Sequence, residues 1–341
     1  MHEGRSGRWR RWLIALSLGL MLAAMGAGYL YRDFRRTPLP VGPKGYRLLV
    51  PQGASLRQVA ARLHRDGILR HPALLVWLGR WRGDAQRIRA GEYALGQGLR
   101  PDGLLDRLVR GQVVQHQLTL VEGWTFHRMM QAVEAEPALV HRLRGLDDAA
   151  IMAAIGHPGE KPEGRFYPET YRFPRGTTDI AFLQRAYDAM AERLRSEWAG
   201  RAPGLPLKNP YQALILASII EKETARDEER PLIAGVFIRR LQRGMRLQTD
   251  PTVIYGLGEA FDGNIRRRDL AHDTAFNTYT RPGLPPTPIC LPRGTSIHAA
   301  LHPAAGDALY FVSRGDGSHQ FSATLEEHQR AVRKYQLGRH P

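Results

Sequence analysis

The sequence predicts a mixed α+β protein that carries one N-terminal membrane-spanning helix. Three observations predict this class. Residues 12–31 contain no charged side chain, short alternating segments near 46–50 and 112–121 are typical of strands, and 210–224 has the spacing of a buried helix. With 341 residues, the chain is long enough for two or three domains.

The apolar segment 12–31 predicts an uncleaved membrane anchor. At a rise of about 1.5 Å per residue, it spans roughly the 30 Å hydrocarbon core of a bilayer. A cleaved signal peptide would have a shorter apolar region of roughly 7–15 residues. Basic residues flank both ends of the segment, and the short basic tail at 1–11 favours a cytoplasmic N-terminus. We therefore expect a single-pass protein of the cell inner membrane with its remaining residues outside the cytoplasm. The flanking residues are Arg5, Arg8, Arg10, Arg11 and Trp12 before the core, and Tyr29, Tyr31, Arg32, Arg35 and Arg36 at its end.

Residues 46–121 predict a small α+β unit that follows a proline-rich linker at 32–45. Ser55 is placed to cap the first helix of this unit. The predicted elements are a strand at 46–50, helices at 56–65 and 72–81, a strand at 90–95, a helix at 101–110 and a strand at 112–121.

The remaining chain predicts helices, ordered loops and a C-terminal hairpin. Segment 164–177 is rich in aromatic residues, proline and glycine, and we interpret it as an ordered loop that frames a site. Segment 243–309 is rich in the glycine and proline that form turns. The predicted helices are 125–135, 180–198, 210–224 and 230–242, and the end predicts strand, Asp-Gly turn, strand and helix.

The formal net charge is +16, from 49 Lys and Arg against 33 Asp and Glu. Such a balance favours anionic lipid or an acidic polymer as a partner, although a solvated arginine-rich surface explains it equally. The sequence has no paired Cys/His ligands and no aromatic ribonucleoprotein signature, so we expect no nucleic-acid partner. A single cysteine excludes an intramolecular disulfide, and no motif indicates a metal or a cofactor.

The stretch LILASIIEKET at 214–224 is an apolar run that ends in two glutamates. Helical spacing places Glu221 on one face with Leu214 and Ser218, whereas Glu223 lies about 200° around the axis. A buried helix end is poorly hydrated and negative in potential, and both effects favour a protonated carboxyl. Such a group can donate a proton to a glycosidic oxygen. The alternative, a solvated helix end with Lys222 paired to its acids, stays open.

A glycosidase normally pairs two carboxylates. No spacing singles out a second acid here, so a mechanism with one acid also stays open. His319 is a candidate base or sugar ligand, or a surface histidine of the hairpin. The candidate second acids are Glu223, Glu169, Asp250 and Asp262.

Several long motifs closely resemble the YceG-like family, in an order that covers the chain from the membrane helix to the last helix. They are VEGWTFHRMM (121–130), GRFYPETYRF (164–173), LILASIIEKETA (214–225), RLQTDPTVIYGLG (246–258), FNTYTRPGLPPTPI (276–289) and YFVSRGDGSHQFSATLEEH (310–328). Known members include membrane-anchored endolytic murein transglycosylases, which are lyases that cut the MurNAc-β-1,4-GlcNAc bond of nascent glycan and leave 1,6-anhydroMurNAc ends.

The resemblance implies that the catalytic residue is the first glutamate of the EKET motif, Glu221, acting as general acid and then as base, with Glu223 in a supporting role. It also implies a LysM-like subdomain at 46–121, a connecting part at 122–205 and a catalytic core at 206–341. The cell-wall role implied is that of a terminase of glycan elongation, with peptidoglycan strands, the cytoplasmic membrane and candidate peptidoglycan synthases as partners. No cofactor is expected.

Polar and aromatic groups within these motifs suit a polysaccharide groove. A non-catalytic wall-binding scaffold and a lysozyme-like hydrolase are the alternatives to a lyase. The candidate substrate-binding residues are Gln248, Asp250, Thr252, Tyr255, Asn277, Thr278, Tyr279 and His319.

Overall fold

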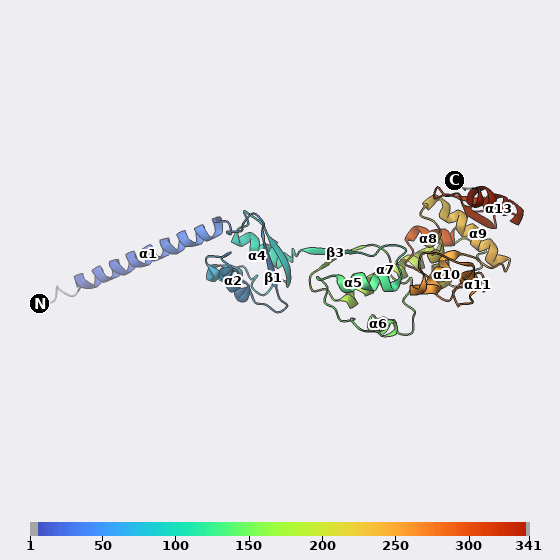
Figure 1. Cartoon of the computed structure of the whole chain (residues 1–341). Coiled ribbons are helices and arrows are strands. Elements are labelled where there is room, and N and C mark those ends of the chain that lie inside the picture. Colours follow the sequence, from blue (N-terminus) through green and yellow to red (C-terminus); the bar gives the residue numbers. More distant parts are fainter. Residues whose placement is uncertain (1–5, 339–341) are drawn as a thin grey trace. The chain divides into compact units, whose positions relative to one another are not determined.

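The computed structural model describes residues 6–338 and confirms a mixed α+β protein with an N-terminal apolar helix (Figure 1). Arg5, a predicted flanking residue, and the rest of 1–5 in the predicted cytoplasmic tail lie outside the described residues. The chain forms two compact units. The first contains 1–116 and 174–176, and the second contains 117–173 and 177–341.

Helix α1 (Ser6–Arg36) is longer than the predicted span of 12–31. An 18-residue window within its segment Arg11–Arg36 has a mean hydropathy of 1.9, and the apolar part of the segment is exposed. It is long and apolar enough to cross a membrane, as the sequence predicts.

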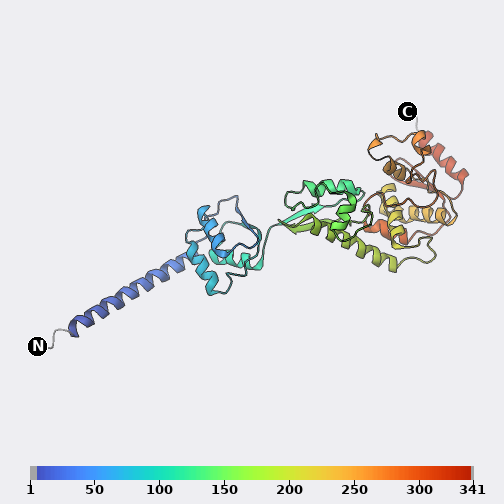
Figure 2. The same cartoon turned by 90° about the horizontal axis from the view of Figure 1, so that it is seen from below.

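The rest of the first unit is an antiparallel strand pair packed against three helices, which appear in Figure 2 as the blue-to-cyan elements after α1. Strand β1 (Tyr46–Val50) pairs with β2 (Gly91–Leu95), so that Tyr46 faces Leu95 and Val50 faces Gly91. The Ser55 side chain caps α2 in a capping box, as predicted. The helices are α2 (Leu56–Arg65), α3 (Pro72–Trp81) and α4 (Pro101–Arg110).

The second unit begins with a two-stranded sheet and three helices that share one aromatic-rich core. Strands β3 (Gln115–Thr119) and β4 (Thr170–Pro174) pair with each other. Strand β4 corrects the prediction of a loop at 164–177. Its TYRFP sequence alternates, which buries Tyr171 and Phe173. The helices are α5 (Phe126–Ala135), α6 (Asp148–Ala154) and α7 (Asp179–Ala199).

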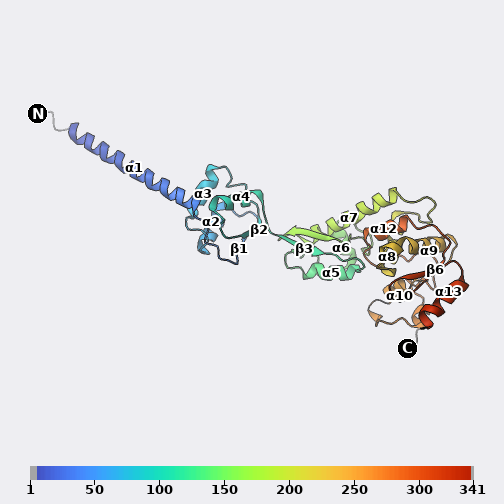
Figure 3. The same cartoon turned by 90° about the horizontal axis from the view of Figure 1, so that it is seen from above.

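Helix α8 (Pro210–Glu223) is the central element of the remaining chain. Asn209 caps it and Pro210 occupies its first turn, as predicted. Every residue from Ala213 to Glu221 is buried, because α7, α9 (Arg230–Gln242), α10 (Asp250–Leu257) and α12 (Gly294–Leu301) all contact this helix. Figure 3 shows α8 among α9, α10 and α12.

The segment 243–309, predicted as turn-rich, contains α10, α11 (Arg267–Ala271) and α12. These helices are five to eight residues long, so they are too short to show a helical period. The C-terminal hairpin and helix are confirmed as β5 (Tyr310–Ser313), β6 (His319–Ser322) and α13 (Leu325–Val332). Short 3₁₀ segments, Asp227–Glu229 and Gly258–Ala260, and a π-helical turn, Arg333–Leu337, complete the described elements.

Candidate active site

The two glutamates at the end of α8 enter different surroundings. The Glu221 side chain is 2% exposed and lies against the start of α12. Arg293 donates from Nε to Oε1 at 2.9 Å and from its backbone nitrogen to Oε2 at 3.0 Å, and the Ser296 hydroxyl donates to Oε2 at 2.7 Å. Arg230, itself buried, lies 3.8 Å from Oε1. These contacts make Glu221 a clamp that joins α8 to α12.

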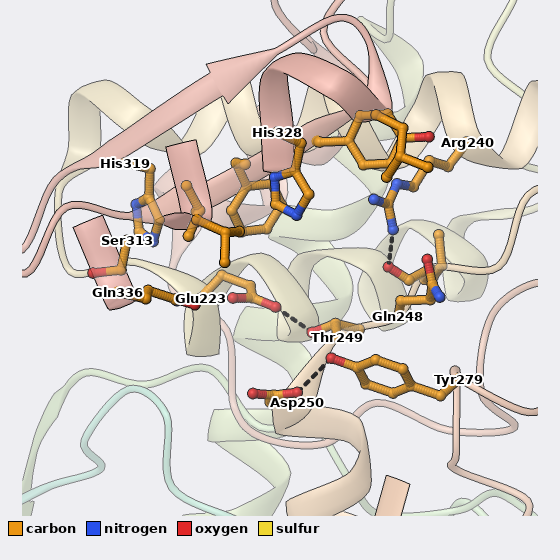
Figure 4. Close-up of a pocket in the computed structure, with 16 residues that line it drawn as sticks. Glu223, Arg240, Gln248, Thr249, Asp250, Tyr279, Ser313, His319, His328 and Gln336 are labelled. Carbon is orange, nitrogen blue, oxygen red and sulfur yellow. Dashed lines mark hydrogen bonds between the residues drawn. The ribbon is translucent and has the colours of Figure 1, made fainter. Parts of the chain in front are cut away.

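Glu223 instead lines a cavity of about 530 Å³ between the 247–250 segment and the C-terminal hairpin (Figure 4). Glu221 is not among the described residues that line this cavity. The wall combines polar, aromatic and cationic groups, which suits a polar substrate with flat apolar faces. The lining side chains include Glu223, Arg240, Gln248, Thr249, Asp250, Tyr279, Tyr310, Phe311, Ser313, His319 and His328.

Burial raises the pKa of Glu223 to about 7, and the nearby Asp250 adds to this rise. A hydrogen bond from the Thr249 hydroxyl and the charge of Arg240 oppose it. A carboxyl with this pKa exists in both protonation states near neutral pH. It therefore meets the requirement for a group that first donates and then accepts a proton.

Four of the predicted substrate-binding residues line the same cavity as Glu223: Gln248, Asp250, Tyr279 and His319. The Tyr279 hydroxyl donates to Asp250 Oδ1 at 2.5 Å, and His319 Nδ1 lies 2.6 Å from Glu229 Oε2. Gln248 has a φ of 49°, the only positive value at a non-glycine position among residues 6–338. Backbone strain of this kind concentrates at functional sites.

Three other predicted residues are buried next to the segments that line the Glu223 cavity. Thr252 and Thr278 are buried and share a hydrogen bond of 2.9 Å, and the Thr278 hydroxyl accepts from the Thr249 backbone nitrogen. The buried Asn277 amide donates to backbone carbonyls of α11 and His272. These side chains fix the loops that carry Thr249 and Tyr279 and do not line the cavity.

Tyr255 lines a second cavity, of about 560 Å³, together with Glu163, His127, Lys222 and Ile254. Its hydroxyl donates to Glu163 Oε2 at 3.0 Å, while the Phe126 backbone nitrogen donates to Oε1 at 3.0 Å. Burial raises the pKa of Glu163 to about 7, against the hydrogen bonds from Tyr255 and the backbone. Glu163 thus ties the start of α5 to α10.

This raised pKa predicts that Glu163 makes the fold less stable as pH increases. The folded chain holds this proton up to about pH 7, whereas the unfolded chain releases it near 4.5, so the stabilisation is complete below 4.5 and lost as pH rises through 7. We expect E163Q to remove up to about 3 kcal/mol of this pH dependence. Urea unfolding across this pH range measures it, with the exposed Glu326→Gln variant as control. The prediction would be contradicted if the free energy of unfolding changed with pH equally in E163Q and the wild type.

The other predicted acids do not join the Glu223 cavity. Glu169 is exposed, and Asp262 is an exposed partner of Arg266 at 2.5 Å. The lowered pKa of Asp262 follows from the hydrogen bond that this arginine donates.

The structure also gathers groups that the sequence prediction missed. These groups carry no local motif of their own, because their partners lie up to 92 residues away. They are Glu163, Arg230, Arg293 and Ser296. The sole sequence signal for Glu163 is its place directly before the aromatic segment 164–177. Elsewhere, ligand atoms of Glu197, His298 and His302 lie within 4.8 Å of one another, a spacing that a metal ion can bridge. Arg193 already pairs with Glu197 at 2.8 Å, and its charge opposes a dication there.

A carboxyl with a pKa near neutrality, in a polar cavity edged by tyrosines and histidines, is the arrangement that acid–base chemistry on a polar substrate requires. The chain belongs to the YceG-like family, whose model matches residues 48–334.

Relatives and a solved structure agree with this membership. An endolytic murein transglycosylase of Bacillus subtilis strain 168 is 29% identical over 336 residues, which cover 91% of each chain. An endolytic murein transglycosylase of Streptococcus pneumoniae is 26% identical over 353 residues; the match covers 93% of this chain but only 63% of that longer relative. The crystal structure of a YceG-like protein of Listeria monocytogenes matches with a TM-score of 0.55 and 29% identity, covering 85% of this chain and 99% of the other.

Proposed function

We propose that the protein is an endolytic peptidoglycan lytic transglycosylase, a lyase that cleaves the MurNAc-β-1,4-GlcNAc bond of nascent glycan strands and leaves 1,6-anhydroMurNAc ends. The observation that carries this proposal is the cavity in which Glu223 has a pKa of about 7. The names of the bacterial relatives support the substrate class.

We propose Glu223 for the proton transfers as an alternative to Glu221, the catalytic residue that the EKET motif implies, and both assignments stay open to test. The Glu221 oxygens are engaged by Arg293 and Ser296, so that an incoming sugar would have to displace these buried contacts. Glu223 has one hydrogen bond, from Thr249, and faces the cavity. The variants Glu223→Gln and Glu221→Gln distinguish this assignment from the sequence prediction that Glu221 is catalytic.

The reaction needs one carboxyl. Protonated Glu223 donates its proton to the bridging oxygen, the bond from the MurNAc anomeric carbon to that oxygen breaks, and the GlcNAc hydroxyl leaves. The MurNAc 6-hydroxyl attacks the anomeric carbon and transfers its proton to the Glu223 carboxylate. The new bond closes the anhydro ring and the carboxyl regains its starting form, so no water is consumed.

Other cavity groups suit the binding of the glycan. Gln248, Asp250 and His319 supply donors and acceptors for sugar hydroxyl and acetamido groups, and Tyr279 and Tyr310 provide aromatic faces. Arg240, buried and 5.1 Å from the Tyr310 ring centre, holds the backbone carbonyls of Leu247 and Leu309, and so joins the two sides of the cavity.

Helix α1 supports a single-pass anchor in the inner membrane with the N-terminus in the cytoplasm, which would hold the enzyme beside growing glycan as a terminase of elongation. Residues 46–121 would then be a LysM-like glycan-binding subdomain. Peptidoglycan synthases are the partners expected at that location.

Mass spectrometry of peptidoglycan digested by the full chain tests the reaction class. A lyase gives anhydro ends, and a hydrolase gives reducing ends heavier by one water. We expect internal cleavage with anhydro ends. Reducing ends would support a hydrolase, and intact strands bound to the protein would support the scaffold alternative.

A further inference from the structure

Helix α3 exposes two tryptophans that the fold of its own unit does not use. Its buried side consists of Leu75, Leu78 and Gly79. On the other side, Trp77 is 51% exposed and Trp81 is 70% exposed. Their rings stack at 6.2 Å with an interplanar angle of 3°. Two large exposed rings in contact indicate an interaction surface, since an isolated exposed apolar side chain would need no explanation.

The tryptophan pair is continuous with the end of α1. The Tyr31 ring meets the Trp77 ring edge-on at 5.3 Å, and Tyr31 marks the end of the uncharged segment. The connection is firm, because Phe34 of α1 is buried in the core of the same unit and Leu39 donates a backbone hydrogen bond to Leu99.

We propose that α3, through Trp77 and Trp81, lies in the headgroup region of the bilayer that α1 spans, so that the first unit rests on the membrane surface. This inference depends on the proposed membrane anchor. Tyrosine and tryptophan favour this region, where the apolar ring is shielded and the polar edge stays hydrated. The region between the hydrocarbon core and bulk water is several ångströms thick on each side, since a bilayer of about 30 Å core measures about 40–45 Å with its headgroups.

With Tyr31 at the boundary of the hydrocarbon core, the Trp77 ring is 5.3 Å away, which is within that thickness. The proposal places the further 6.2 Å from Trp77 to Trp81 along the membrane surface. The exposed Arg32, Arg36 and Arg80 flank these rings and would face lipid phosphates. Basic residues near an anionic lipid surface are attracted to it. Both the aromatic rings and the charges therefore fit an anionic phospholipid surface.

Spin-label accessibility of the full chain tests this placement in vesicles of phosphatidylethanolamine and phosphatidylglycerol. A label at R80C, between the two tryptophans, is compared with a label at L18C in α1 and one at Q52C. Gln52 is exposed and follows Val50, which pairs with Gly91 at the end of the β1–β2 ladder. The native Cys290 is buried. The protein without an introduced cysteine is treated with the same label, to measure the background signal from Cys290.

We expect oxygen to reach position 18 better than a polar nickel chelate does, and the reverse at position 52. At position 80 we expect a ratio of the two accessibilities between these values, because the headgroup region is partly hydrated. Lipid exposure at 18 together with aqueous exposure at 80 would overturn the inference while leaving the anchor intact. Aqueous exposure at 18 would overturn the anchor and, with it, the inference.

A substitution series shows whether the rings cause the placement. Trp77→Ser with Trp81→Ser in the R80C protein should shift position 80 to aqueous accessibility, since these exposed side chains are not part of the core. Leu49→Ser, at a 42% exposed apolar residue of β1, is the matched control and should leave the accessibility of position 80 unchanged. An equal result for the two variants would refute a role for the tryptophans.

Discussion

Glu223→Gln is expected to lower the rate of glycan cleavage by about 10²–10⁴-fold, the usual contribution of a positioned acid–base group. Glutamine keeps the size of the side chain and its contact with Thr249, but it cannot donate and recover a proton. Release of anhydro-ended fragments from purified peptidoglycan measures the rate.

The pH profile of the wild type gives an independent measure of the same group. Burial raises the pKa of Glu223 to about 7, and cleavage requires the protonated form at the start. Activity is therefore expected to be retained below pH 7 and to fall about tenfold per unit above it. A profile that stays flat well above pH 7 would argue against Glu223 as the donor.

Glu221→Gln is the matched control for this assignment, because it makes the same chemical change two residues earlier. Its amide oxygen can still accept from Ser296, so we expect a loss of activity below about tenfold when equal folded fractions are compared. The opposite ranking, with Glu221→Gln inactive but folded and Glu223→Gln active, would restore the sequence prediction.

The sequence predicts much of the fold because its longer elements have clear patterns. Each of these elements has a local signal. Helix α1 has an uncharged run, α2 a capping residue, α8 an apolar run and the C-terminal hairpin an Asp-Gly turn. Helices α10 and α12 have none, because eight residues between glycine and proline show little more than two turns.

The site is less predictable, since it depends on which distant segment covers each side chain. Helical geometry correctly places Glu221 and Glu223 on different faces. It does not reveal that Arg293 and Ser296, more than 70 residues later, enclose Glu221, or that the hairpin with His319 leaves a cavity beside Glu223. Sequence reasoning therefore identifies the motif but not the surroundings of its two carboxyls.

Glu221→Ala is expected to destabilise the second unit by about 3–5 kcal/mol, the usual cost of removing one partner from a buried ion pair. The change leaves Arg230, whose side chain is 1% exposed, without its buried carboxylate. It also removes the acceptor of the Ser296 hydroxyl and of the Arg293 backbone nitrogen. Denaturant unfolding of the full chain in detergent measures the loss.

Glu326→Ala is the surface control. Glu326 is 77% exposed and pairs with Arg330 at 2.8 Å, so its removal should cost less than about 1 kcal/mol. A Glu221→Ala loss no larger than this would mean that the clamp between α8 and α12 contributes nothing to stability.

The double variant Glu221→Leu with Arg230→Met separates the value of the pair from the cost of an unpaired charge. Removing both buried charges avoids the desolvation of either one alone, and an apolar pair of similar volume is often tolerated. We therefore expect the double variant to lose less stability than the sum of the two single changes. Arg230 also donates to the Thr224 carbonyl at 3.2 Å, so part of its own loss should persist in the double variant. Additive losses would show that Glu221 and Arg230 act independently, and that Arg293 and Ser296 account for the clamp.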